Sequence, residues 1–144
     1  MKTFKIYTAG KMSGLSYDEQ MGWRLELERL VRTISNNVIF VHPPHYYRYG
    51  DGINQSEREA MVWDLAQIQD SDIVVVNLNN IGSSIGTQME LGFIEAVNQL
   101  STKHIHLIGV GKPDIEHPWL SEVLLRRDDT LEQAAAYISA YLLI

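Results

Sequence analysis

The chain has no cysteine, no long apolar run and no excess of basic residues, and each absence narrows what it can be. Its 144 residues contain no apolar stretch of about 18 residues, the length at which a transmembrane helix is suspected. The N-terminal residues MKTFKIYTAG enter a strand-like pattern directly, without the apolar region of a signal peptide. With the lack of cysteine, these features predict a cytoplasmic protein without a membrane partner.

The charge balance is acidic. Twelve Lys and Arg residues face 18 Asp and Glu residues, for a formal net charge of -6, and the basic residues do not form a stripe. Affinity for a long polynucleotide comes largely from neutralising phosphates, so we expect no polynucleotide partner. A single nucleoside or nucleotide remains compatible with this charge.

The five histidines are too scattered to predict a metal centre. They are His42, His45, His104, His106 and His117. Two histidines two positions apart in a strand more often form a surface pair than a ligand set. We therefore predict neither a metal nor a cofactor.

Apolar runs alternate with helical periodicities, which predicts one doubly wound α/β domain over residues 1–144. A domain of this size, 45% apolar, buries roughly 70% of its unfolded surface. We expect strands at residues 4–9, 38–41, 73–76, 104–110 and 123–125. Helices are expected at residues 17–35, 56–69, 87–98 and 131–143, with a helical turn at 117–122. This is the pattern of a flavodoxin-like five-stranded parallel sheet of order 2-1-3-4-5 with helices on both faces.

Two of these segments carry finer expectations. In the helix at 17–35, Met21, Leu25 and Ile34 fall on the apolar face and Arg24 falls on the solvent face. The segment 45–55 is rich in Tyr and Gly and is expected to be a loop. Its tyrosines could stack on a planar base or simply fill the gap over a helix end.

Glu90 is the most informative residue of the chain. Phe93, Ile94 and Val97 follow it by three, four and seven positions, which places the carboxylate on the apolar stripe of its helix. A charge there needs an explanation, and two compete. Thr87 and Glu90 have the spacing of a capping box, whereas a functional carboxylate would use the same position.

The small-residue loop before this helix should face another loop. Ligands of open α/β sheets bind beyond the carboxyl ends of the strands where strand order reverses, here between the first and third strands. Tyr7 and residues 10–14 follow the first strand, while Ser84, Gly86 and Glu90 follow the third. We therefore expect both groups to line one crevice.

Three blocks in these positions resemble the nucleoside 2-deoxyribosyltransferase family, which includes the 2'-deoxynucleoside 5'-monophosphate N-glycosidases. They are IYTAG at residues 6–10, DLAQI at 64–68 and GTQMELG at 86–92, and the resemblance spans roughly residues 4–110. The block around Glu90 is the most specific of the three.

The resemblance implies cleavage of an N-glycosidic bond in a nucleoside or nucleotide, with transfer of the sugar to a free nucleobase or to water. Glu90 would be the nucleophile on C1' of the sugar, Tyr7 would orient it, and Asp64 would be the acid that serves the base. Asp64 could also be a merely solvated side chain. The residues expected to contact substrate are Gly10, Lys11, Ser13, Gly14, His42, Ser84, Gly86 and Met89.

Departures from the family pattern keep other functions open. Ser84 stands where transferases of the family often carry Asp, and a serine there resembles the monophosphate hydrolases. Those hydrolases tend to carry Arg in the first glycine loop, where this chain has Ser13, with Lys11 the nearest cation. Hydrolysis of a 5'-monophosphate is therefore the alternative. An NAD glycohydrolase-like enzyme and a non-catalytic nucleotide sensor rank lower. Family sites are completed across a dimer, so we expect a homo-oligomer in which Trp119 and Ser121 could reach a neighbouring site.

Overall fold

Five parallel strands form one sheet in the computed structural model, which describes residues 2–47 and 53–144. The spatial order is β2-β1-β3-β4-β5, which confirms the predicted flavodoxin-like topology. The strands are β1 (Phe4–Ala9), β2 (Val38–Val41), β3 (Ile73–Asn77), β4 (His106–Val110) and β5 (Arg126–Asp128). In this register Tyr7 of β1 lies beside Val41 of β2 and Val74 of β3.

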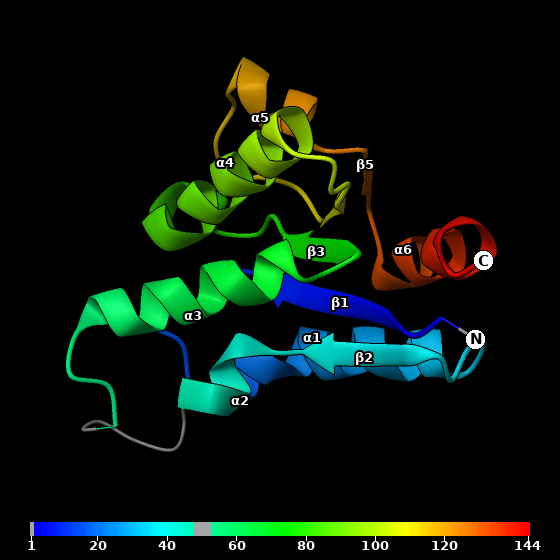
Figure 1. Cartoon of the computed structure of the whole chain (residues 1–144), viewed down its shortest axis with the longest axis horizontal. Coiled ribbons are helices and arrows are strands. Elements are labelled where there is room, and N and C mark those ends of the chain that lie inside the picture. Colours follow the sequence, from blue (N-terminus) through cyan, green and yellow to red (C-terminus); the bar gives the residue numbers. More distant parts are fainter. Residues whose placement is uncertain (1, 48–52) are drawn as a thin grey trace.

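Helices cover both faces of the sheet (Figure 1), and the covered faces explain the unbroken apolar run of β3. Helices α1 (Tyr17–Arg32) and α6 (Leu131–Tyr137) pack on one face, and the turn η2 (Ile138–Leu142) continues α6. Helices α3 (Glu57–Gln69), α4 (Ile85–Leu100) and α5 (Pro118–Val123) pack on the other. The short elements α2 (Pro43–Tyr47) and η1 (Ile81–Ser83) follow β2 and β3. No helix among the described residues has the length and apolarity needed to cross a membrane.

Alternation along β1 divides its side chains between these two layers. Ile6 belongs to the apolar cluster under α1 and α6, and Tyr7 belongs to the cluster under α3 and α4. Thr8 points back toward α1, where the Arg24 side chain contacts it. The end of β1 therefore connects the two layers at the edge where the site lies.

Several predicted boundaries are wrong. The fifth strand, predicted at residues 123–125, lies at Arg126–Asp128, because Val123 is the last residue of α5. His117 caps the start of α5 through its side chain. The segment 45–55 is not a loop throughout, since α2 extends to Tyr47. The rest of the predicted tyrosine loop between residues 48 and 52 lies outside the described residues.

The predicted faces of α1 also need correction. Arg24 was placed in solvent but is fully buried, whereas Leu25 is 53% exposed and Ile34 is 64% exposed. The buried positions are Met21, Arg24, Leu27 and Val31. This spacing of three to four residues places Arg24 on the buried face of the helix. The prediction that it lies in solvent is wrong because it rests on the charge of the side chain alone.

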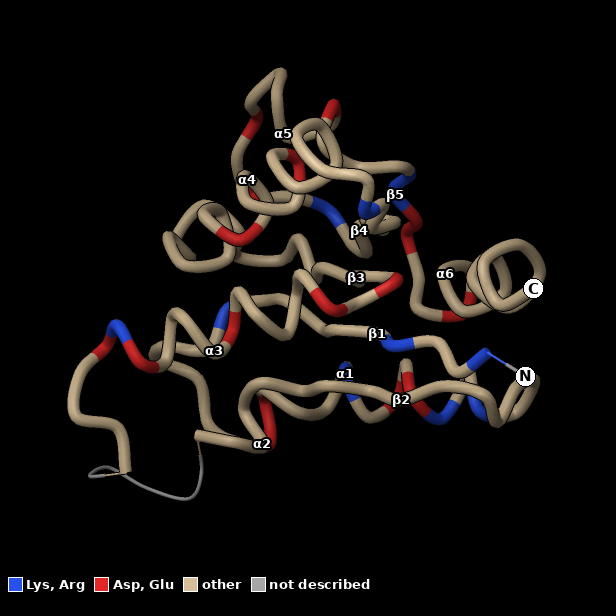
Figure 2. Tube along the Cα trace, viewed as in Figure 1, with Lys and Arg blue, Asp and Glu red and all other residues tan. Residues whose placement is uncertain are grey.

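Basic and acidic residues lie close together on α1 and at β5 (Figure 2). On α1, Arg29 pairs with Glu26 and Arg32 pairs with Glu28. At β5, Arg126 pairs with Asp128. The charges of these elements are thus largely compensated locally.

Candidate active site

The structure brings Tyr7 and Glu90 into direct contact. The Tyr7 hydroxyl donates a hydrogen bond of 2.7 Å to Oε2 of Glu90. Tyr7 lies near the carboxyl end of β1 and is fully buried, and Glu90 lies in the second turn of α4, the helix that follows β3. The contact therefore joins the two strands at which the order of the sheet reverses, as the topology predicts.

The capping-box explanation of Glu90 is wrong in this structure. Helix α4 begins at Ile85 with Ser84 as its N-cap, so Thr87 lies inside the first turn. The Thr87 hydroxyl bonds to that of Ser84 at 2.6 Å. The Glu90 carboxylate therefore does not cap the helix, and it accepts the hydrogen bond from Tyr7 instead.

The pKa of Glu90 is raised to about 7, chiefly by burial and also by the neighbouring carboxylate of Asp64, while the Tyr7 hydrogen bond and the positive charge of Arg24 oppose the rise. Burial and the nearby carboxylates also raise the pKa of Tyr7. The phenol therefore stays protonated and remains a hydrogen-bond donor. Glu90 is an acid that changes its charge close to neutral pH.

Asp64, on α3, is also partly buried. Its Oδ1 atom is buried and has no hydrogen-bond partner among the described residues. Burial raises the pKa of Asp64 to about 6, and hydrogen bonding with Tyr47 partly offsets the rise. The alternative of a merely solvated Asp64 does not fit these surroundings. A carboxyl group with this pKa can deliver or accept a proton near neutrality.

Tyr47 was missed as a site residue because a single tyrosine in an aromatic-rich segment carries no spacing signal. It lies on α2 and lines a hollow of about 750 Å³ together with Tyr46, Ala60 and Trp63. The rings of Tyr46 and Trp63 lie 4.6 Å apart. Tyr47 therefore links this aromatic hollow to Asp64.

The two glycine-containing loops also meet. The Lys11 ammonium, in the loop after β1, donates a 2.8 Å hydrogen bond to the Ser83 hydroxyl before α4. In the β1 loop, Gly14 has a φ of +79°, a left-handed conformation that favours glycine. Ser84 is buried at the start of α4, while Gly86 and Met89 are exposed on its first turns.

His42, a predicted substrate contact, is buried, and both of its ring nitrogens have partners. Its Nδ1 lies 2.8 Å from the Thr8 hydroxyl and its Nε2 lies 2.7 Å from Oε1 of Glu28. Burial lowers the pKa of His42. A contact with substrate would require one of these two hydrogen bonds to open.

The described residues contain no group of three His, Cys, Asp or Glu side chains placed to hold a metal ion. The site consists of two partly buried carboxyl groups, a phenol and a helix N-terminus beside a lysine. Such a site can provide a nucleophile and a proton donor to a polar small molecule.

Together the sheet order and this site define a flavodoxin-like α/β protein with its candidate site at the topological switch point. A scan of protein-family models and a search of curated proteins gave no match for the chain. Solved structures do share the fold. A conserved protein from Enterococcus faecalis superposes with a TM-score of 0.75 at 14% identity, covering 94% of this chain and 97% of that one. A 2-deoxyribosyltransferase from Bacillus psychrosaccharolyticus superposes with a TM-score of 0.66 at 19% identity, covering 92% and 91%.

Proposed function

We propose that the protein is an enzyme of the nucleoside 2-deoxyribosyltransferase family that cleaves the N-glycosidic bond of a (deoxy)nucleoside. The observation that carries the proposal is the 2.7 Å contact between Tyr7 and Glu90 at the switch point of the sheet. The family resemblance of the sequence supports it, and so does the fold shared with a 2-deoxyribosyltransferase. Its substrates would be a nucleoside and a free nucleobase.

In the first half of the reaction, a Glu90 oxygen bonds to C1' of the sugar as the bond from C1' to the base nitrogen breaks. Because Tyr7 occupies Oε2, we assign the attack to Oε1. The reacting form is the one in which Glu90 is ionised and Asp64 carries the proton, the less populated arrangement of the pair because the pKa of Glu90 is about 7 and that of Asp64 about 6. In this form Asp64 donates its proton to a nitrogen of the departing base, which leaves neutral. The product is a glycosyl ester on Glu90 and an ionised Asp64.

In the second half, the nitrogen of another base or a water molecule bonds to C1' and displaces Glu90. Asp64 takes up the proton that the incoming group loses, which returns both carboxyl groups to their starting states. Two displacements at one carbon retain the configuration at C1'.

Two measurements test this proposal. Incubation with a deoxynucleoside and a different free base should give the exchanged nucleoside, detected by chromatography. A 2-fluoro-arabinosyl nucleoside should leave a slowly hydrolysed sugar adduct on Glu90, located by peptide mass spectrometry. An adduct on another residue would reject Glu90 as nucleophile, and release of sugar without exchange would reject transfer.

Hydrolysis of a nucleoside 5'-monophosphate is a second candidate, favoured by the Lys11 contact. The Lys11 ammonium lies 2.8 Å from the Ser83 hydroxyl, next to the N-terminus of α4. A cation and a helix N-terminus together suit a phosphate group.

Under this second candidate, Lys11→Met should lower kcat/KM for the monophosphate about 10- to 100-fold and leave the value for the free nucleoside nearly unchanged. Steady-state kinetics on both substrates provide the measurement. Lys112→Met, at an exposed position outside the site, is the control for the loss of one charge. Equal losses on both substrates, or a clear preference of the wild type for the nucleoside, would reject a phosphate site.

A further inference from the structure

Arg24 is a fully buried guanidinium whose hydrogen bonds go to neutral groups. It donates to the Thr8 hydroxyl at 3.2 Å, to the Gln20 carbonyl at 2.5 Å and to the Gly10 carbonyl at 3.3 Å. Within residues 2–47 and 53–144, none of the ion pairs involves Arg24. Fully buried charges are rare unless an opposite charge compensates them. The fold therefore raises the question of which anion offsets Arg24.

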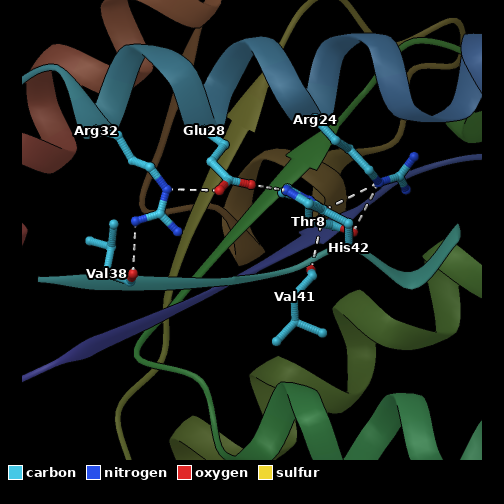
Figure 3. A network of polar contacts seen from close by, with 7 residues as sticks. All are labelled: Thr8, Arg24, Glu28, Arg32, Val38, Val41 and His42. Carbon is cyan, nitrogen blue, oxygen red and sulfur yellow. Dashed lines mark hydrogen bonds and ion pairs between the residues drawn. The ribbon is translucent and has the colours of Figure 1, made fainter. Parts of the chain in front are cut away.

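The carboxylate on the α1 side is already compensated (Figure 3). Glu28 forms an ion pair of 2.7 Å with Arg32 and accepts a hydrogen bond from His42. These two contacts hold the pKa of Glu28 below its usual range although burial raises it. His42 then contacts the Thr8 hydroxyl, so this side reaches Arg24 only through uncharged groups.

On the other side of β1, neither Glu90 nor Asp64 forms an ion pair among the described residues, and Glu90 is the one that Tyr7, the neighbour of Thr8 on β1, holds by a hydrogen bond. Burial lowers the pKa of Arg24 to about 10, and its interactions with Tyr7 and Glu90 oppose that shift, so the guanidinium stays charged at neutral pH. Reciprocally, the charge of Arg24 lowers the pKa of Glu90. The other titratable groups near the pair are Asp64, which raises the pKa of Glu90, and Tyr47, which acts on Tyr7.

We propose that Arg24 is a positioning residue of the candidate active site, which supplies the positive charge for the Glu90 carboxylate from behind β1 and fixes the backbone of the first glycine loop. It does not touch substrate in this proposal. Its effect on rate rests on the proposed function, whereas its charge coupling to Glu90 does not.

The mechanical half of this role follows from the packing at Gly10. A Cβ atom at Gly10 would lie 3.1 Å from the Trp23 ring and in ordinary contact, at 3.5 Å, with the Arg24 guanidinium, so α1 packs tightly against this glycine. The Gly10 carbonyl accepts from Arg24, and the next residue, Lys11, reaches across to Ser83. Arg24 thus holds one wall of the crevice at the point where the two loops meet.

The charge coupling can be measured without turnover. In protein carrying ¹³C at the glutamate carboxyl carbons, the Glu90 signal is identified by its loss in Glu90→Gln and titrated with pH. We expect the pKa of Glu90 to rise by about one unit in Arg24→Met and in Arg24→Gln. Arg24→Lys keeps the charge and should stay near the wild type. Arg29→Met removes an exposed charge from the same helix and should change nothing.

If the proposed function also holds, the higher pKa of Glu90 in Arg24→Met changes the pH dependence of the reaction in a predictable direction. The nucleophile must be ionised, so the acid limb of kcat/KM should move to higher pH in Arg24→Met, with about a tenfold loss on the acidic side and a smaller loss above neutrality. Arg24→Lys should restore the limb. An unchanged limb with a shifted Glu90 titration would reject the catalytic assignment of Glu90 and leave the coupling intact.

A second measurement covers the case in which neither neutral variant folds. The ammonium introduced by Arg24→Lys can be titrated by its own side-chain signal, with Glu90 present or replaced by Gln. We expect its pKa to be about one unit lower when Glu90 is replaced. Equal values in the two backgrounds, or unchanged Glu90 titration in folded Arg24→Met, would overturn the proposal.

Discussion

Glu90→Gln is expected to lower kcat for base exchange by about 10⁴-fold or more while leaving the affinity for the nucleoside within a few-fold of the wild type. The amide keeps the size of the side chain and can still bond to Tyr7, but it cannot form the ester with C1'. Steady-state kinetics give kcat, and calorimetry gives the affinity. The chemically identical change Glu95→Gln, on the same helix and beside Gln99, is the control.

The same variant separates an enzyme from a nucleotide sensor. A wild-type protein that binds nucleosides, nucleotides or NAD but turns none of them over would support a sensor. Turnover in Glu90→Gln at near wild-type rates would remove Glu90 from the reaction altogether. Loss of affinity together with activity would assign it to binding.

Asp64→Asn should lower kcat for an ordinary purine deoxynucleoside by about 10²- to 10⁴-fold, because the departing base then lacks its proton donor. The loss should nearly vanish for an N7-methylated purine deoxynucleoside, whose base leaves without needing a proton. Comparing kcat for the two substrates measures this directly. Asp70→Asn, at the exposed end of the same helix, is the matched control. Equal losses on both substrates would show that Asp64 acts in some other way.

The elements predicted best from the sequence are those whose signal is local and redundant. The strands β1 and β2 have the predicted bounds: β2 is an uninterrupted apolar run, and β1 is mostly apolar and lies directly before a glycine. Their order then follows from the rules for parallel sheets, and it brings Tyr7 to Glu90. The central contact of the site was predictable because topology, more than side-chain detail, determines it.

Identical local patterns gave different outcomes where tertiary contacts compete. Ser56 and Glu59 form the capping box that their spacing predicts. Thr87 and Glu90 have the same spacing, but the N-cap of α4 is Ser84, three residues before Thr87, and Tyr7 holds the carboxylate. Spacing describes only what a segment can do alone, so a partner 83 positions away is invisible to it.

Arg24 shows the converse failure. Because its side chain is charged, Arg24 is predicted on the solvent face, but it lies three residues from both Met21 and Leu27 and is buried with them. Besides the Gln20 carbonyl on α1 itself, the carbonyl acceptors of Arg24 come from β1 and the loop after it, which no window of α1 contains. A charged residue at apolar helical spacing can therefore indicate a buried charge whose partners come from other parts of the chain.

The pairing of β1 with β2 and β3 has a consequence for misfolding. Because neighbouring side chains of a strand point to opposite faces, a slip of β1 by one residue would exchange the phenol of Tyr7 for the hydroxyl of Thr8. Such a slipped form would keep its secondary structure, yet it would leave the acid on α4 without its donor and the arginine on α1 facing an aromatic ring. Circular dichroism would hardly distinguish the two forms, and inactive but folded material in a refolded sample is where this slip should be sought.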